Sequence, residues 1–151
     1  MENKLNITVS NRVKSQAFRP PTNEKWACIS IFTPGDTPAD INGFTKVMHL
    51  CFDDVCSSIP TATRFTPQIA GETWAFIDEI IELGITNLLV HCDAGISRSP
   101  GMAIAIDEIV NGSTDRAAKH PCYNSLVYST MMNTDKIRKD TGFTFIKDHF
   151  G

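Results

Sequence analysis

The stretch NLLVHCDAGISRSPG occupies residues 87–101, near the middle of the chain. It joins an apolar run that ends in a His–Cys pair, a short loop with one glycine, and an Arg-Ser-Pro segment. A bounded apolar run is typical of a strand buried in a sheet, and a proline fits the first turn of a helix. The stretch therefore predicts strand, loop and helix in that order, with a cysteine at the end of the strand.

Three further segments predict strands. Residues 5–9 (LNITV) alternate and are β-branched, which indicates a short strand that fits the edge of a sheet. Residues 26–32 (WACISIF) and 46–52 (KVMHLCF) are more continuously apolar. Continuous apolar runs suit strands in a sheet that is covered on both faces.

A long helix is predicted between the last two strands. Thr66 can cap it, Pro67 fits its first position, and Gly84 fits just past its end. Its apolar residues recur on one helical stripe, as expected for a helix that packs on a core. The members of the stripe are Ile69, Phe76, Ile77, Ile80 and Ile81.

The order of these elements predicts the fold class. A second helix should begin near Ser97 and end near residues 111–112 (Asn-Gly), and residues 124–133 and 143–150 are also compatible with helices. Alternating strands and helices favour an α/β fold with a mainly parallel central sheet of about four to five strands, flanked by helices. A chain of this length predicts one domain over residues 1–151.

Composition limits the class of protein. Of the 151 residues, 42% are hydrophobic and 21% are charged, which is typical of a globular protein. The net charge of −3 argues against general nucleic-acid binding, although it leaves room for a local positive pocket. The chain has no run like that of a signal peptide, and none near the roughly 20 apolar residues that span a membrane. We therefore expect no nucleic-acid partner and no membrane span.

The cysteines and histidines do not predict a metal site. The five cysteines include no CxxC pair, and His49, His120 and His149 are isolated in the sequence. An odd number of cysteines also does not suit a disulfide framework, so a reducing, cytoplasmic location and no cofactor are expected. The cysteines are Cys28, Cys51, Cys56, Cys92 and Cys122.

The loop after Cys92 has the chemistry of an anion site. Small residues allow backbone N–H groups to turn inward, and the start of the next helix adds unpaired N–H donors. Arg98 offers a planar fork that matches two phosphate oxygens, and the same donors favour the thiolate form of Cys92, a nucleophile. The predicted phosphate-binding residues are Asp93, Ala94, Gly95, Ile96, Ser97 and Arg98.

Residues 91–99, HCDAGISRS, resemble the Cys-x5-Arg-Ser signature of the cysteine-dependent protein tyrosine phosphatases, and most of all its dual-specificity branch. The order of strands and helices extends the resemblance over about residues 26–112. The resemblance implies a three-layer phosphatase-type fold and hydrolysis of phosphate monoesters without a metal. The implied substrate is a phosphorylated protein or a small phosphomonoester.

The resemblance also implies a role for each residue of the signature. Cys92 would be the nucleophile that forms a phosphocysteine, and Arg98 would hold the phosphoryl group and its transition state. Ser99 would hydrogen-bond the thiolate and help it to leave during hydrolysis. His91 would orient the loop rather than transfer protons.

A general acid is the remaining requirement of this mechanism. The family has an aspartate just after the strand that precedes the long helix, and here two neighbours, Asp53 and Asp54, occupy that place. The family pattern of apolar residues, one variable position and then the acid favours Asp54, with Asp53 as the alternative. Cys51 and Cys56 flank this pair. A regulatory disulfide with Cys92 is an alternative to simple packing for them.

Other functions are left open by the sequence. A phosphatase of inositol phosphates or phosphoinositides is one, but Asp93 puts an acid where related lipid phosphatases carry basic residues, unless its side chain projects outward. A catalytically weak phosphate-recognition module is another, although Cys92, Arg98 and an acid candidate are all present. An arsenate reductase is less well supported, because those that resemble low-molecular-weight phosphatases carry the loop near the N-terminus, whereas Cys92 comes late in this chain. A rhodanese-like enzyme is also less well supported, because rhodanese loops usually lack the His-Cys-x5-Arg-Ser pattern.

Overall fold

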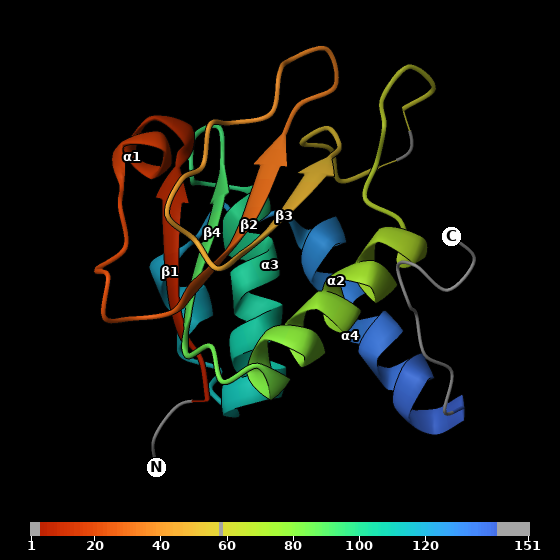
Figure 1. Cartoon of the computed structure of the whole chain (residues 1–151). Helices are drawn as coiled ribbons and strands as arrows, with labels where there is room; N and C mark the ends of the chain where they lie inside the picture. The colour runs from red at the N-terminus through yellow and green to blue at the C-terminus, as the bar shows by residue number, and fades with distance from the viewer. Residues whose placement is uncertain (1–3, 58, 142–151) are drawn as a thin grey trace, which may run out of the picture.

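Four apolar and β-branched runs form one central sheet. The structure is a computed structural model that describes residues 4–57 and 59–141. The strands are β1 (Asn6–Asn11), β2 (Trp26–Phe32), β3 (Lys46–Cys51) and β4 (Asn87–Cys92). Their order is β1-β4-β2-β3, and every pairing is parallel (Figure 1). The prediction of an α/β fold around a parallel sheet is confirmed.

The strand boundaries follow the sequence patterns closely. The segments 26–32 and 87–92 coincide with β2 and β4. Strand β1 runs from Asn6 to Asn11 instead of over the predicted 5–9, and within the described part of the chain it pairs only with β4, at the edge of the sheet. The third strand ends at Cys51, one residue earlier than predicted. Phe52 still donates its backbone N–H to the Phe32 carbonyl, at 3.2 Å, so the chain leaves the sheet directly after that residue.

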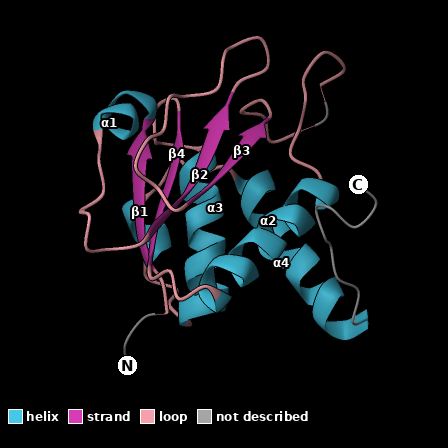
Figure 2. Cartoon of the chain, viewed as in Figure 1, coloured by secondary structure: helices cyan, strands magenta, loops and turns pink. Residues whose placement is uncertain are grey.

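Three helices cover one face of the sheet (Figure 2). They are α2 (Pro67–Glu82), α3 (Arg98–Ile106) and α4 (Ser125–Thr141). The Thr66 side chain caps α2 as predicted, accepting from the Ile69 N–H at 3.2 Å. A π-helical turn, η1 (Asp107–Asn111), continues α3 to its end at Gly112.

Helix α4 is longer than the segment 124–133 that predicted it. Asp135 lies on its buried side, 3% exposed, and forms ion pairs with Arg138 and Lys139. A paired carboxylate in a buried position interrupts the apolar repeat, so the sequence pattern stopped too early. The other segment proposed as a helix, 143–150, lies outside the described residues.

The core lies between the sheet and these helices. Ile29 of β2 and Val90 of β4 point into it, and Trp74 of α2 is fully buried there. The Trp74 indole N–H donates to the Met131 carbonyl at 2.9 Å, which ties α2 to α4. The predicted stripe of α2 faces this core, with Ile77 and Ile80 fully buried and Ile69, Phe76 and Ile81 partly buried.

The short helix α1 (Arg12–Ala17) follows β1 at the carboxyl ends of the strands (Figure 1). The sequence did not predict it, because six residues are too few to show a helical period. Its cap is local: the Asn11 side chain accepts from the Lys14 N–H at 2.8 Å. On the sheet face opposite the core, Phe18 packs on Trp26, with ring centroids 5.0 Å apart.

A polar cluster holds the amino-terminal end of the sheet. Arg116, in the short 3-10 helix η2 (Arg116–Lys119), pairs with buried Asp107 at 2.9 Å and donates to the Ile7 carbonyl. Asn111 bridges Asp107 and the backbone of Leu5. Among the described residues, no helix is long and apolar enough to cross a membrane.

Candidate active site

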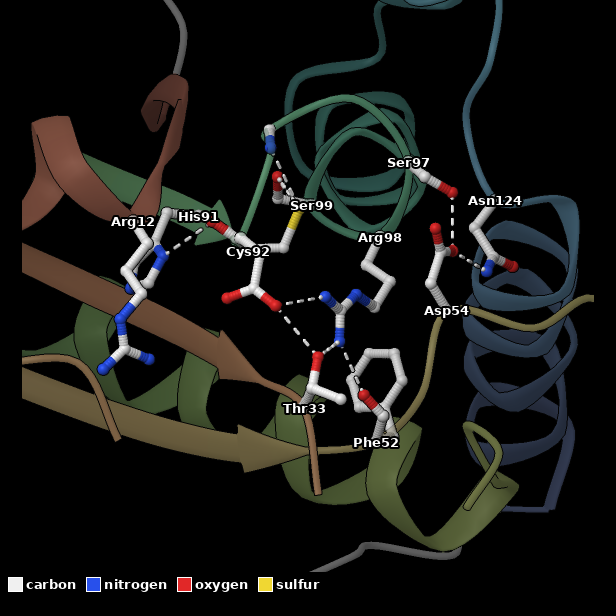
Figure 3. Close-up of polar contacts among 12 residues, drawn as sticks. Arg12, Thr33, Phe52, Asp54, His91, Cys92, Ser97, Arg98, Ser99 and Asn124 are labelled. Atoms are coloured by element: carbon white, nitrogen blue, oxygen red, sulfur yellow. Dashed lines mark hydrogen bonds and ion pairs between the residues drawn. The ribbon is translucent and has the colours of Figure 1, made fainter. Parts of the chain in front are cut away.

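The predicted site residues meet at the carboxyl ends of parallel strands. Cys92 is the last residue of β4 and is 2% exposed, Asp54 follows β3, and Thr33 follows β2. Parallel strands end at the same edge of a sheet, and ligands bind beyond that edge in open α/β sheets. Figure 3 shows these side chains around one loop.

The loop after β4 folds around the cysteine sulfur. The Gly95 N–H donates to Cys92 Sγ at 3.3 Å, and Ser99 Oγ lies 3.1 Å from the same sulfur. Ser99 is fully buried in the first turn of α3. These contacts bring the predicted nucleophile and Ser99 together. The phosphate-binding role of the loop backbone, residues 93–97, stays a prediction.

Gly95 is the one loop position where a side chain cannot fit. Its φ is +72°, and a Cβ there would lie 2.8 Å from the Ser10 carbonyl oxygen. The end of β1 therefore packs directly on the loop backbone. A glycine is required both by the left-handed conformation and by this close approach.

Gly95→Ala is expected to lower the free energy of unfolding more than Gly112→Ala. Gly112 has a similar φ of +70° but nothing within 4 Å of its Cβ position, so it isolates the backbone cost of about 1–2 kcal/mol. The clash with Ser10 should add about 1–3 kcal/mol at Gly95. Urea unfolding of both variants measures the difference, and equal losses would contradict the close approach.

The Arg98 side chain is buried, and the terminal nitrogens of its guanidinium are hydrogen-bonded to the protein. Its Nη1 donates to the Phe52 carbonyl at 2.7 Å and to Thr33 Oγ1 at 3.0 Å (Figure 3). Its Nη2 pairs with Asp93 Oδ2 at 3.2 Å. The Asp93 carboxylate therefore turns toward Arg98 and does not project outward. A planar cation fixed at this loop is suited to a tetrahedral anion.

The two candidate acids lie in different environments. Asp54 Oδ1 accepts from Ser97 Oγ at 2.6 Å and from Asn124 Nδ2 at 2.8 Å, so it contacts the loop. Asp53 Oδ2 instead accepts from the Thr63 N–H at 2.7 Å, away from these contacts. The geometry brings Asp54, and not Asp53, to the loop of Cys92. This contact favours Asp54 as the acid, a role that stays a prediction.

Asn124 is a site residue that the sequence did not predict. Its Oδ1 accepts from the Val127 N–H at 3.0 Å and caps α4, while its Nδ2 donates to Asp54. An asparagine before a helix has a sufficient explanation as a cap, and its contact with Asp54 spans 70 positions of sequence. No local pattern could have revealed this second contact.

His91 lies under the loop in a buried network. Its Nε2 lies 2.6 Å from Ser30 Oγ, and its Nδ1 lies 3.2 Å from the Cys92 carbonyl oxygen. Burial, chiefly, and the nearby positive charge of Arg12 lower the pKa of His91 below its ordinary value of 6.5. A neutral imidazole between two strands suits the predicted orienting role better than proton transfer.

Because of this histidine, the free energy of unfolding is expected to decrease as the pH is lowered. Native His91 resists a proton that the unfolded chain accepts below about pH 6.5, so its contribution is complete above that pH and lost below it. The loss approaches about 1.4 kcal/mol per pH unit between the two pKa values. The free energy of unfolding, measured with urea between pH 7.5 and pH 5, should therefore change less with pH in His91→Gln than in the wild type. Equal slopes in both proteins would contradict this.

The cysteines differ in environment. All five, each within the described residues, are free thiols. Burial raises the pKa of Cys28 to about 12, which makes that thiol unreactive. Cys51, Cys56 and Cys122 are exposed. The exposure of Cys51 and Cys56 does not fit the packing role expected for them, and a regulatory disulfide with Cys92 stays a prediction.

The fold is similar to solved structures that are named as phosphatases or as phosphatase-like. No protein-family model matches the chain, and no curated protein matches its sequence significantly. Human tyrosine phosphatase-like serine/threonine/tyrosine-interacting protein superposes with a TM-score of 0.60 at 18% identity, over 88% of this chain and 93% of that one. Human DUSP28 superposes with a TM-score of 0.60 at 12% identity, over 89% and 94%.

A third similar structure is a mouse dual specificity phosphatase complexed with zinc tungstate. Its TM-score is 0.59 at 15% identity, over 90% of this chain and 86% of that one. The fold of this chain is therefore dual-specificity phosphatase-like, as the resemblance of residues 91–99 implied.

Proposed function

We propose that this chain, which has a dual-specificity phosphatase-like fold, hydrolyses phosphate monoesters through a cysteinyl-phosphate intermediate. One observation carries the proposal: Cys92 Sγ is hydrogen-bonded by Gly95 and Ser99 inside the loop that Arg98 closes, and Asp54 contacts that loop from a different strand end. The similar solved structures support it: one is named tyrosine phosphatase-like, and another is named a dual specificity phosphatase and holds tungstate, a tetrahedral oxyanion like phosphate.

In the first step, the Cys92 thiolate attacks phosphorus. A sulfur–phosphorus bond forms as the bond to the leaving oxygen breaks, and Asp54 in its acid form gives that oxygen a proton. Arg98 and the inward N–H groups stabilise the charge on the phosphoryl oxygens. An alcohol or phenol leaves, and Asp54 remains as a carboxylate.

In the second step, water attacks the phosphocysteine. The Asp54 carboxylate takes a proton from the water, an oxygen–phosphorus bond forms, and the sulfur–phosphorus bond breaks. The Ser99 hydroxyl, 3.1 Å from Sγ, hydrogen-bonds the sulfur as it leaves as a thiolate. Inorganic phosphate is released and the starting protonation of Asp54 is restored, so no metal or redox partner is needed.

The proposed substrate is a phosphorylated protein or a small phosphomonoester. A recognition module without turnover would need only the phosphate-binding loop, whereas here Asp54 and Ser99 also contact it or its sulfur. This convergence favours an enzyme. The free thiols are consistent with the expected cytoplasmic location, which stays a prediction, as does the absence of nucleic-acid binding.

The test is hydrolysis of p-nitrophenyl phosphate by the wild-type chain in EDTA and reductant, combined with acid quenching during turnover. We expect turnover that EDTA does not inhibit, and a trapped peptide in which Cys92 carries one phosphoryl group by mass spectrometry. Turnover without this adduct under any quench condition would argue for direct attack by water. Tungstate binding without hydrolysis of any monoester would favour the recognition module.

A further inference from the structure

The protein uses some, but not all, of the hydrogen-bond donors of Arg98. A guanidinium has five N–H donors. Three are used inside the chain, two on Nη1 and one on Nη2. Among the described residues, no group accepts from Nε. The edge formed by Nε and the second Nη2 hydrogen therefore remains for a ligand.

The Nη1 and Nη2 groups of Arg98 take part in a hydrogen-bond network with Thr33 and Asp93. Thr33 Oγ1 accepts from Arg98 Nη1 at 3.0 Å and donates its only hydrogen to Asp93 Oδ2 at 2.9 Å. The same Asp93 oxygen accepts from Arg98 Nη2 at 3.2 Å. Each of the three side chains contacts the other two, so neither Asp93 nor Thr33 can move without freeing a donor of Arg98.

We propose that Asp93 and Thr33 are positioning residues that hold one edge of the Arg98 guanidinium, so that its Nε–Nη2 edge faces the phosphoryl group. This inference rests on the proposed function, since it assigns how that site holds its anion. Hydrogen-bond donors that are already oriented stabilise a transition state without the energetic cost of reorienting during the reaction. Neither residue touches the reacting atoms in this scheme.

Asp93 has two opposing effects on an anion, and burial indicates which one is larger. Its negative charge repels phosphate, but its side chain is 40% exposed, so water screens that repulsion. The Arg98 side chain is only 6% exposed, so its donors depend on protein partners for their orientation. Positioning should therefore outweigh repulsion, and removal of Asp93 should weaken binding.

The experiment compares Asp93→Asn, Asp93→Ala, Thr33→Ser and Thr33→Val by calorimetric titration with tungstate and by turnover of p-nitrophenyl phosphate. The amide keeps an acceptor for Nη2 and the methyl group does not, so affinity should fall from wild type to Asn to Ala. For Asp93→Ala and Thr33→Val we expect losses of about tenfold in tungstate affinity and in kcat. Thr33→Ser keeps the hydroxyl and should therefore show nearly the tungstate affinity and kcat of the wild type.

The control is Asp36→Asn, which removes one exposed negative charge from the turn that Thr33 begins. It should change neither quantity. In Asp93→Ala/Thr33→Val, the two losses should be less than multiplicative, because both changes act on one arginine.

A purely electrostatic role for Asp93 predicts the opposite order. Both Asp93 variants would then bind tungstate more tightly than wild type and to equal extents, which would overturn the proposal. Equal effects of Thr33→Ser and Thr33→Val would also overturn it. If wild type binds tungstate but hydrolyses nothing, the proposed reaction fails, while the order of tungstate affinities still decides the role of Asp93 and Thr33.

Discussion

Cys92→Ser is expected to abolish hydrolysis of p-nitrophenyl phosphate, with a loss of at least about ten-thousand-fold in kcat. A serine hydroxyl is close in size to the thiol and keeps the neighbours Gly95 and Ser99. It remains protonated at neutral pH, whereas the attacking species in the proposed mechanism is a thiolate. Steady-state assays at matched substrate concentrations measure the loss.

Tungstate binding separates this loss from damage to the loop. The anion is expected to bind Cys92→Ser within about tenfold of wild type, because the remaining donors are unchanged. Cys122→Ser is the matched control, since it replaces an exposed thiol and should leave kcat unaltered. Substantial turnover by Cys92→Ser would mean that the sulfur is not the nucleophile.

The sequence predicted the parts of the site that are local. Residues 87–101 contain the strand, the loop and the helix start within one continuous stretch, so the backbone must bring Cys92, Gly95 and Ser99 together. The boundaries of β2 and β4 were equally readable, because both strands are buried over most of their length and are therefore continuously apolar.

Contacts between distant segments could not be predicted in the same way. Thr33 reaches Arg98 across 65 positions of sequence, and Asn124 reaches Asp54 across 70. Both depend on the order of strands in the sheet and on where α4 begins, and periodicity carries no information about either. Each residue also has an ordinary local explanation, as part of a turn or as a helix cap.

The distinction between the two aspartates shows the same limit. In sequence, Asp53 and Asp54 are adjacent and chemically equal, so only a family pattern separated them. In the fold, the chain bends at this pair, and the Val55 N–H donates to the Asp53 carbonyl at 3.0 Å, so the two side chains point to different surroundings. One carboxylate therefore reaches the Thr63 N–H and the other reaches Ser97, so a difference of one position decides which of them contacts the loop of Cys92.

Asp54→Asn is accordingly expected to lower kcat for an alkyl phosphate by about 10²–10⁴-fold. The alkoxide leaves poorly without a proton, and an amide has none to give. For p-nitrophenyl phosphate the loss should be much smaller, because that phenolate leaves readily unprotonated.

Asp53→Asn is the matched control for this prediction. It removes the same charge one position earlier, and it should leave kcat for both substrates nearly unchanged, because the Asp53 side chain accepts a hydrogen bond from the Thr63 backbone instead of contacting the loop. Asn124→Ala tests the support of Asp54: it removes a donor 2.8 Å from Oδ1 and should weaken alkyl phosphate turnover by less than Asp54→Asn does. Two aspartate variants with equal losses on both substrates would show that neither carboxylate acts as the proton donor. The leaving-group comparison is therefore the measurement that distinguishes acid catalysis from a general effect of charge at this edge of the sheet.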